Sequence, residues 1–122
     1  MTPKTKKTSK SWAARLWKLY RLTPDDFRKM TAAQGGKCAI SGKRPLNLRL
    51  NIDHRHGDGL IRGLLTMTMN KGLGYFNDDP ALLRAAADYL DNPPAVQALG
   101  RKVYGLLGQA KVKRIMKYGP KG

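Results

Sequence analysis

The amino-acid sequence predicts an α+β fold: a small, mainly helical domain around a two-stranded hairpin that leads into a helix. Three observations predict it. Thr23-Pro24-Asp25-Asp26 is a strong helix start, apolar residues alternate over residues 46–52 and return over residues 60–65, and Asp79-Pro80 opens a further stretch of helical spacing. A chain of 122 residues is long enough for one modest core and usually too short for two.

Residues 1–10 are rich in Lys, Thr and Ser, which predicts a flexible basic arm. Ser11 can then cap a short helix, in which Trp12 and Trp17 are expected to pack. The chain is expected to divide into three segments: the arm and short helix over residues 1–19, a central domain over residues 20–92, and a basic helical tail over residues 93–122.

The second helix carries clear start and stop signals. Thr23 is a preferred N-cap, Pro24 suits the first helical position, and the two carboxylates that follow meet the positive end of the helix dipole. The helix should run to about Ala33. Gly35 and Gly36 then end it, because glycine accepts the left-handed conformation that stops a helix.

A hairpin is expected next. The apolar residues of its first strand alternate and therefore share one face; they are Leu46, Leu48, Leu50 and Ile52. Asp53 and His54 fall at the end of this strand. The turn Gly57-Asp58-Gly59 then leads into residues 60–65 as the returning strand.

Helices should make up the rest of the chain. Thr66 or Thr68 caps a helix that reaches about Tyr75. Pro80 opens another, and Asn92-Pro93-Pro94 closes it. Its expected buried side carries Leu82, Leu83, Ala86 and Leu90. A basic amphipathic helix is expected to follow through Val96, Leu99, Val103 and Leu106, although three glycines weaken that pattern.

The charge of the chain points to a polyanionic partner. Its 24 Lys and Arg residues against 8 acidic residues, all Asp, give a formal net charge of +16. Every acidic residue lies between positions 25 and 91, so both ends are purely basic and suit phosphate backbones. Solvated charge without a partner, or packing against structural RNA, would give the same composition, which does not separate DNA from RNA.

Cys38 is the only cysteine, so an intrachain disulfide is excluded and nothing points to an oxidising compartment. We expect a cytoplasmic protein. The first ten residues lack the apolar stretch of a signal peptide, and no window approaches about 18 consecutive apolar residues. Neither export nor a membrane partner is therefore expected.

The predicted hairpin and the helix after it bring a carboxylate, an imidazole and an amide towards one cleft. Asp53 and Asn70 offer oxygen ligands that Mg²⁺ accepts while it keeps several waters, which leaves room for phosphate oxygens. The imidazole of His54 could take a proton from an attacking water. Taken singly, these residues have ordinary roles: either His54 or His56 could hydrogen-bond within the hairpin, and Asn70 could simply lie on a helix. However, the only two histidines of the chain stand two apart beside an Asp.

An ordered set of motifs resembles the recombination endonuclease VII family. The motifs cover about residues 20–92 and are Leu22-Thr23-Pro24-Asp25-Asp26-Phe27, Gln34-Gly35-Gly36-Lys37-Cys38-Ala39-Ile40, Ile52-Asp53-His54-Arg55-His56, Arg62-Gly63-Leu64-Leu65, Asn70-Lys71-Gly72-Leu73-Gly74, Asp78-Asp79-Pro80 and Leu82-Leu83-Arg84-Ala85-Ala86-Ala87-Asp88-Tyr89-Leu90. The resemblance implies an HNH-type nuclease with the ββα-metal fold, from a phage-infected or prophage-carrying bacterial host. It implies Asp53 and Asn70 as ligands of Mg²⁺ or Mn²⁺, His54 as general base, and His56 as a contact to the scissile phosphate.

The sequence differs from the usual pattern of this family at the four positions expected to bind a structural zinc. Members usually carry two C-x-x-C pairs, whereas the four positions here are held by Cys38, Ser41, Thr66 and Met69. Three thiolates are missing, and hydroxyl and thioether groups are poor replacements in a tetrahedral zinc site. We therefore expect no structural zinc. The segments around these four positions, here called the knuckle, are expected to be held by packing instead. The packing residues would be Cys38, Ile40, Leu65, Met67 and Met69.

The leading hypothesis is a metal-dependent endonuclease that hydrolyses phosphodiester bonds in DNA, at branched junctions or by nicking duplex. One alternative is a nucleic-acid-binding protein that keeps the nuclease fold without catalysis, which the degraded knuckle supports. Another is an RNA-associated structural protein, which would not need the Asp-His and Asn pattern. Junction resolution by paired nicks would favour a homodimer. The expected DNA contacts are Lys4, Lys6, Lys7, Lys10, Arg55, Arg62, Lys71, Lys111, Lys113 and Arg114.

Overall fold

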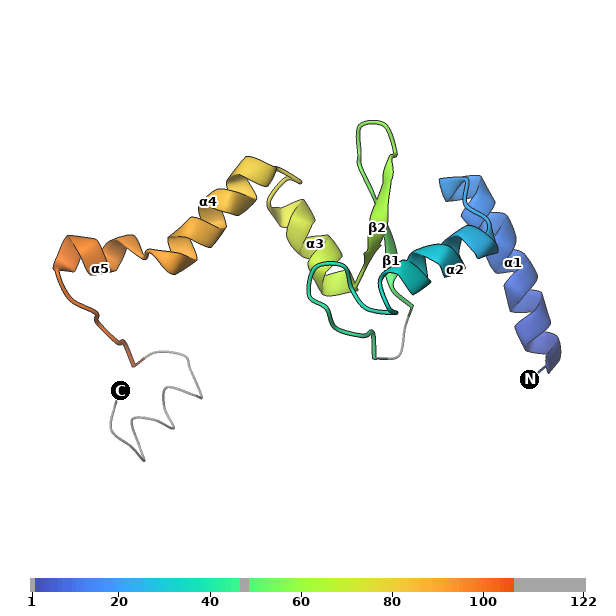
Figure 1. Cartoon of the computed structure of the whole chain (residues 1–122), viewed down its shortest axis with the longest axis horizontal. Coiled ribbons are helices and arrows are strands. Elements are labelled where there is room, and N and C mark those ends of the chain that lie inside the picture. The colour runs from blue at the N-terminus through green and yellow to red at the C-terminus, as the bar shows by residue number, and fades with distance from the viewer. Residues whose placement is uncertain (1, 47–48, 107–122) are drawn as a thin grey trace, which may run out of the picture. The chain divides into compact units, whose positions relative to one another are not determined.

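The computed structural model describes residues 2–46 and 49–106, with side chains from residue 11 onward, and these form an α+β fold that is mainly helical, as predicted (Figure 1). The elements are α1 (Thr2–Tyr20), α2 (Pro24–Ala33), β1 (Asn51–His54), β2 (Ile61–Leu65), α3 (Met67–Tyr75), α4 (Pro80–Asp91) and α5 (Pro94–Leu99). The chain forms two compact units, one ending at Asp79 and the other beginning at Pro80. The predicted segment limits at 19/20 and 92/93 remain a prediction.

Helix α1 corrects the prediction of a flexible arm, because it begins at Thr2 and Ser11 lies inside it. No glycine interrupts residues 2–20, and Pro3 falls in the first turn, where its missing N–H costs no hydrogen bond. Trp12 packs as expected, with its ring edge-on to Phe27 at 5.2 Å between centroids. Trp17 does not: it is 51% exposed, and Leu16 is the buried residue of this helix.

Helix α2 has the predicted start and end. The Thr23 hydroxyl accepts the backbone N–H of Asp26 at 3.0 Å, and the Asp26 carboxylate accepts the backbone N–H of Thr23 at 2.9 Å. This reciprocal capping satisfies N–H groups that the first helical turn leaves unpaired. At the other end, Gly35 and Gly36 adopt φ of 64° and 74°, the left-handed values that stop the helix.

The hairpin is shorter than the alternating leucines predicted. Leu46 is 96% exposed and outside any strand, residues 47–48 fall outside the described chain, and β1 begins only at Asn51. Strand β2 has five residues, and Asn51 already pairs with its last one, Leu65, so the described residues just upstream of Asn51 have no partner in β2. The two site residues Asp53 and His54 therefore lie within β1, where the ladder fixes their backbone.

The antiparallel register contains a bulge at the site. Ile52 pairs with Leu64 and Asp53 with Gly63, but His54 pairs with Ile61, so Arg62 has no opposite residue. An extra residue of this kind breaks the alternation of side chains along a strand and turns one side chain in a new direction. Here the redirected side chain is that of Arg62.

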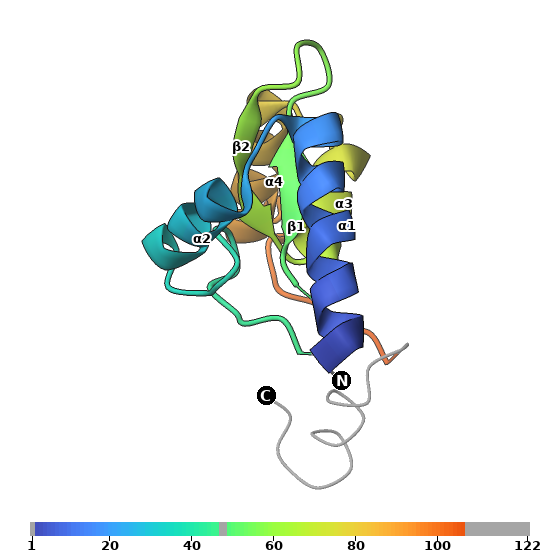
Figure 2. The ribbon, with the colours of Figure 1, turned by 90° about the vertical axis from the view of Figure 1, so that its right-hand side faces the viewer.

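The core lies where α2 and α3 contact the hairpin, with the hairpin between α3 and the first two helices (Figures 1 and 2). Its buried residues are Cys38, Leu50, Leu64 and Leu65, and Phe27, Met30, Ile52, Met69 and Leu73 pack against them. Thr66, rather than Thr68, caps α3, since its hydroxyl accepts the N–H of Met69 at 3.4 Å. Packing of Met69 and Leu73 against the core fixes the turn of α3 that carries Asn70.

The unit that begins at Pro80 differs from the prediction in its packing. Helix α4 starts and stops at the predicted prolines, but it has no buried residue, and Leu82 and Leu90 are 42% and 75% exposed. Helix α5 ends at Gly100, whose φ of 71° is left-handed, so Val103 and Leu106 do not continue a helix. In residues 2–46 and 49–106, no helix combines the length and hydropathy needed to span a bilayer.

Candidate active site

A cavity of about 210 Å³ lies between the hairpin and α3, and it brings together the four predicted catalytic and metal-binding residues. Its lining residues are Asp53, His54, His56, Asn70, Lys71, Gly74 and Asp78. Strand β1 supplies Asp53 and His54, the loop after it supplies His56, and α3 supplies Asn70. The hairpin and the helix that follows it thus place a carboxylate, two imidazoles and an amide around one cavity.

The two imidazoles are neighbours. The ring of His54 lies edge-on to that of His56, with 5.8 Å between centroids, and the ring of Tyr20 lies 6.0 Å from His54 on another side. Tyr20 is the last residue of α1 and was not among the predicted site residues. No sequence pattern pointed to it, because nothing in the sequence relates the end of α1 to the end of β1.

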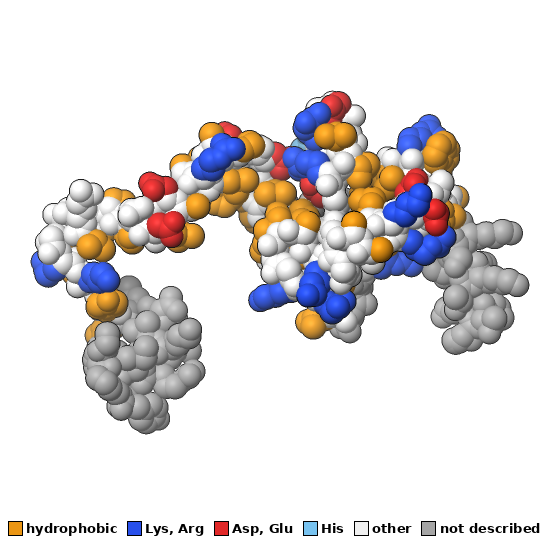
Figure 3. Space-filling model, viewed as in Figure 1, with side chains coloured by type: hydrophobic (Ala, Val, Ile, Leu, Met, Phe, Trp, Pro, Cys, Tyr) orange, Lys and Arg blue, Asp and Glu red, His pale blue; other side chains and the backbone are white. Residues whose placement is uncertain are grey.

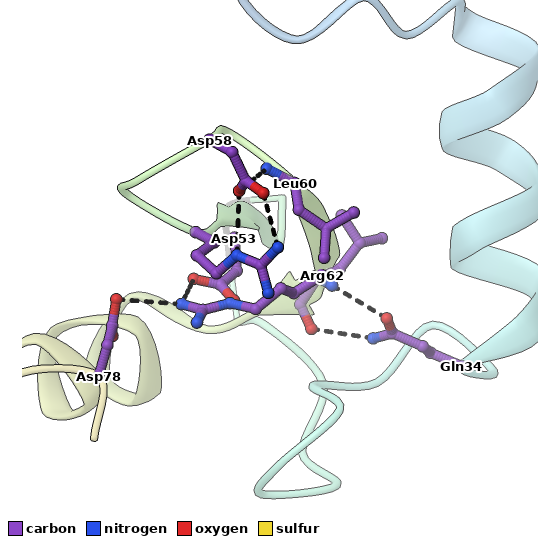
Figure 4. A network of polar contacts seen from close by, with 8 residues as sticks. Gln34, Asp53, Asp58, Leu60, Arg62 and Asp78 are labelled. Carbon is purple, nitrogen blue, oxygen red and sulfur yellow. Dashed lines mark hydrogen bonds and ion pairs between the residues drawn. The ribbon is translucent and has the colours of Figure 1, made fainter. Parts of the chain in front are cut away.

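Asp53 is the buried charge of the site, with 6% of its surface exposed. Arg62 pairs with it twice: Nε donates to Oδ2 at 2.6 Å and Nη2 to Oδ1 at 3.0 Å. Nη2 also lies 3.3 Å from Oδ2 of Asp78, so the guanidinium lies between two carboxylates (Figure 4). The hydrogen bonds to Asp53 raise the pKa of Arg62 above its ordinary value. Arg62 was predicted to contact DNA, whereas the structure gives it partners within the protein.

Arg55 also has a partner within the hairpin. Its Nε and Nη2 donate to the Asp58 carboxylate at 2.9 and 2.6 Å, and Asp58 accepts the N–H of Leu60 at 3.1 Å (Figure 4). The hydrogen bonds from Arg55 hold the pKa of Asp58 well below its usual range. Both side chains are more than half exposed, so the pair organises the turn at the surface, and a DNA contact by Arg55 remains a prediction.

The recombination endonuclease VII profile matches residues 13–92, about two thirds of the chain, and this range contains every residue that lines the cavity. The chain belongs to the recombination endonuclease VII family. The predicted resemblance is therefore confirmed, and the matched region begins within α1 rather than near residue 20. The endonuclease VII match leaves out the predicted DNA contacts in residues 4–10 and 111–114.

Two curated relatives come from phages. The Gene 59 proteins of Mycobacterium phage L5 and Mycobacterium phage D29 are 38% and 39% identical to this chain over 105 residues. Each match covers 82% of this chain and 62% of the relative, so the chain spans about 62% of the length of these relatives. No solved structure matches the chain.

Ser41 and Thr66, two of the residues expected at the degenerate zinc-ligand positions, lie at the Cys38 thiol. Its sulfur is acceptor to the N–H of Thr66 at 3.3 Å and to the Thr66 hydroxyl at 3.7 Å. Burial raises the pKa of this thiol, but hydrogen bonds from Ser41 and from backbone N–H groups outweigh burial and lower the pKa to about 6. Leu65 and Met69 pack in this region as predicted. Ile40 and Met67 are 53% and 49% exposed and do not belong to the core, so their predicted packing role is wrong.

A second cavity, of about 440 Å³, lies at the start of α3 and is rimmed by Lys43, Arg44 and Arg49. Arg49 stacks over the ring of Trp12 at 4.0 Å. Within the described part of the chain, none of these cations forms an ion pair with Asp, and Figure 3 shows Lys and Arg side chains over the hairpin tip and over the segment between α2 and β1. None of these three cations was among the predicted DNA contacts, which came from the two basic ends and from the motifs around the site.

Of the other predicted DNA contacts, Lys71 lines the site cavity. The side chains of Lys4, Lys6, Lys7 and Lys10, and residues Lys111, Lys113 and Arg114, lie outside what the structure describes.

Proposed function

We propose that this chain is a metal-dependent DNA endonuclease of the HNH type, with β1, β2 and α3 as its ββα-metal core. The observation that carries the proposal is the shared cavity of Asp53, His54, His56 and Asn70 in a member of the recombination endonuclease VII family. Family membership supports the reaction class, and the cavity supports these residues as the ones that would perform it on a phosphodiester.

The donor atoms in the cavity fit Mg²⁺ or Mn²⁺. Within residues 2–46 and 49–106, no three His, Cys, Asp or Glu side chains form a group suited to a metal. Mg²⁺ does not need such a group, because it keeps several waters and binds through one or two carboxylates together with phosphate oxygens. Asp53 supplies carboxylate oxygens, which in the metal-free protein pair with Arg62, and the Asn70 amide oxygen is a further hard donor.

Each residue of the cavity has a separate role in the proposed reaction. Asp53 and Asn70 would hold the cation, which when bound polarises the phosphate and stabilises charge on the leaving oxygen. His54 takes the proton from the attacking water, and His56 and Lys71, on the same cavity, hold the phosphate oxygens in place. Tyr20 packs beside His54 and restricts the ring orientations open to it.

DNA is the proposed substrate, in duplex or branched form. Nucleic-acid affinity comes mostly from neutralised phosphates, and the chain carries a net charge of +16. The rim of Lys43, Arg44 and Arg49 offers a positive surface beyond the cutting site. Paired nicks at a junction would require two sites, which a homodimer supplies.

Cleavage of sequence-matched linear, nicked and four-way DNA with Mg²⁺ tests the proposal, with Asn70→Ala as the control. We expect the wild-type protein to cut at least one substrate and the variant to cut none at a comparable rate. Tight DNA binding by the wild-type protein without cleavage under Mg²⁺ or Mn²⁺ would favour the binding protein that has lost catalysis.

A further inference from the structure

The guanidinium of Arg62 lies between the buried Asp53 and Asp78, and both carboxylates line the cavity where a cation is proposed to bind. We propose that Arg62 is a positioning residue that neutralises Asp53 in the metal-free protein and shifts onto Asp78 when a divalent cation binds. Asp78 then sets the affinity of the site for the cation. The inference rests on the proposed metal site and adds two residues to it.

The metal-free protein needs Arg62 because of where Asp53 lies. Its carboxylate is 6% exposed on a strand of the hairpin, and a buried charge without a partner is strongly destabilising. Arg62 meets it with a two-point pair at 2.6 and 3.0 Å, the geometry in which a guanidinium binds a carboxylate best. The bulge between Asp53 and His54 makes this pair reachable, since Arg62 has no opposite residue in the ladder.

A bound cation changes this balance. A divalent cation and a guanidinium at one carboxylate repel each other, and the repulsion is strong away from water. The Asp78 carboxylate already lies 3.3 Å from Nη2 of Arg62, so the guanidinium has its second partner within reach. Asp53, Asp78, Arg62 and Lys71 together carry no net charge, so a divalent cation adds two positive charges, which a phosphodiester partly offsets.

The backbone holds Asp78 in place for this exchange. Asn77 and Asp78 both adopt left-handed conformations, with φ of 57° and 55°, directly after α3. The N–H of Asp78 donates to the carbonyl of Leu73 at 2.8 Å and so ties the residue to the end of that helix. Non-glycine residues keep such conformations when their surroundings fix them, and these often occur at functional sites.

The two residues should change cation binding in different ways. With Asp78→Asn the guanidinium has no second carboxylate, so a cation must compete with it for Asp53, and affinity should fall by about tenfold, within the usual range of coupling between sites. With Arg62→Gln the metal-free protein loses the partner of Asp53. Its melting temperature should fall, and saturating Mg²⁺ should raise it by more than in the wild-type protein.

Titration of Mn²⁺ followed by the electron paramagnetic resonance of the free ion measures affinity without DNA or turnover. The wild-type protein, Asp78→Asn and Asp58→Asn are compared; the last removes the same charge from the hairpin turn, where it pairs with Arg55. We expect Asp58→Asn to match the wild-type protein and Asp78→Asn to bind about tenfold more weakly. Equal affinities for wild type and Asp78→Asn would overturn the exchange and leave the metal site standing. Absence of Mn²⁺ binding by the wild-type protein would overturn the proposed function as well.

Discussion

The thiol of Cys38 is buried, yet hydrogen bonds from Ser41 and nearby N–H groups favour its ionised form. Its pKa is lowered from 9.0 to about 6 in the folded protein, so the unfolded chain binds more protons between these values. Stability should therefore rise between about pH 6 and pH 9 by roughly 1 kcal/mol per pH unit, and this contribution should be lost as pH falls through about 6.

Urea unfolding at several pH values between about 6 and 9 measures this contribution. Cys38→Ala removes the titrating group and should flatten the rise, although it also lowers stability at every pH because a buried contact is lost. An unchanged slope in Cys38→Ala would show that another group carries the pH dependence.

At the scale of elements, Gln34 joins α2 to β2. Its side-chain amide donates to the Leu64 carbonyl at 2.9 Å, and its side-chain oxygen accepts the Leu64 N–H at 2.9 Å, so it extends the sheet by one rung. Gly63 leaves room for this approach, since a Cβ there would lie 3.3 Å from the Gln34 side-chain oxygen.

Gln34→Ala should lower the free energy of unfolding by about 2 kcal/mol, because the N–H of the fully buried Leu64 loses its acceptor, while the Leu64 carbonyl keeps the N–H of Ala39 at 3.1 Å. Chemical denaturation checks this value. Thr31→Ala is a suitable comparison, since it removes a hydroxyl that bonds only within α2 and should cost less. Equal losses of unfolding free energy in the two variants would mean that the hydrogen bonds between Gln34 and Leu64 do not stabilise the contact between α2 and β2.

The knuckle around Cys38 is expected to contain no stoichiometric zinc. Thr66 and Ser41 donate hydrogen bonds to the sulfur and offer hydroxyls, which are poor zinc ligands compared with thiolates. Elemental analysis of protein purified without chelator should give far less than one zinc per chain. One zinc per chain that disappears in Cys38→Ser would contradict this reading.

Local signals in the sequence predicted most elements of this fold. Thr23 and the glycines after Gln34 define α2 through contacts within a few residues, and Asp53, His54 and Asn70 could be grouped because a hairpin and the next helix are adjacent in space. The pair between Arg62 and Asp53 could not be predicted, because it depends on a bulge that no residue pattern reveals. Strand β1 was predicted too long because its length is set by the partner strand, not by its own alternation.

At the scale of the whole molecule, charge should control binding to DNA. Each phosphate that is neutralised contributes about −0.9 to the slope of log K against log salt. If Lys43 and Arg44 each meet one phosphate, replacing both with Ala should reduce the slope by about 2. Fluorescence anisotropy with labelled duplex at several salt concentrations measures this.

The control is Arg28→Ala with Lys29→Ala, which removes the same charge from exposed side chains that already pair with Asp25. These cations should contribute less to the slope. If replacing Arg28 and Lys29 reduced the salt slope as much as replacing Lys43 and Arg44, net charge alone would explain binding. The cavity at the start of α3 would then have no role.

His54 is proposed to move a proton in a metal-dependent cleavage reaction, and the single-turnover rate of plasmid nicking measures that step. His54→Ala should slow cleavage by about 10² to 10⁴ with folding and DNA affinity largely kept, since one neutral side chain among many phosphate contacts adds little affinity. Asp53→Ala should also be inactive, but raised Mg²⁺ or Mn²⁺ should partly restore it and should not restore His54→Ala. A His54→Ala protein that cuts at the wild-type rate would contradict the account and leave His56 to be tested as the base.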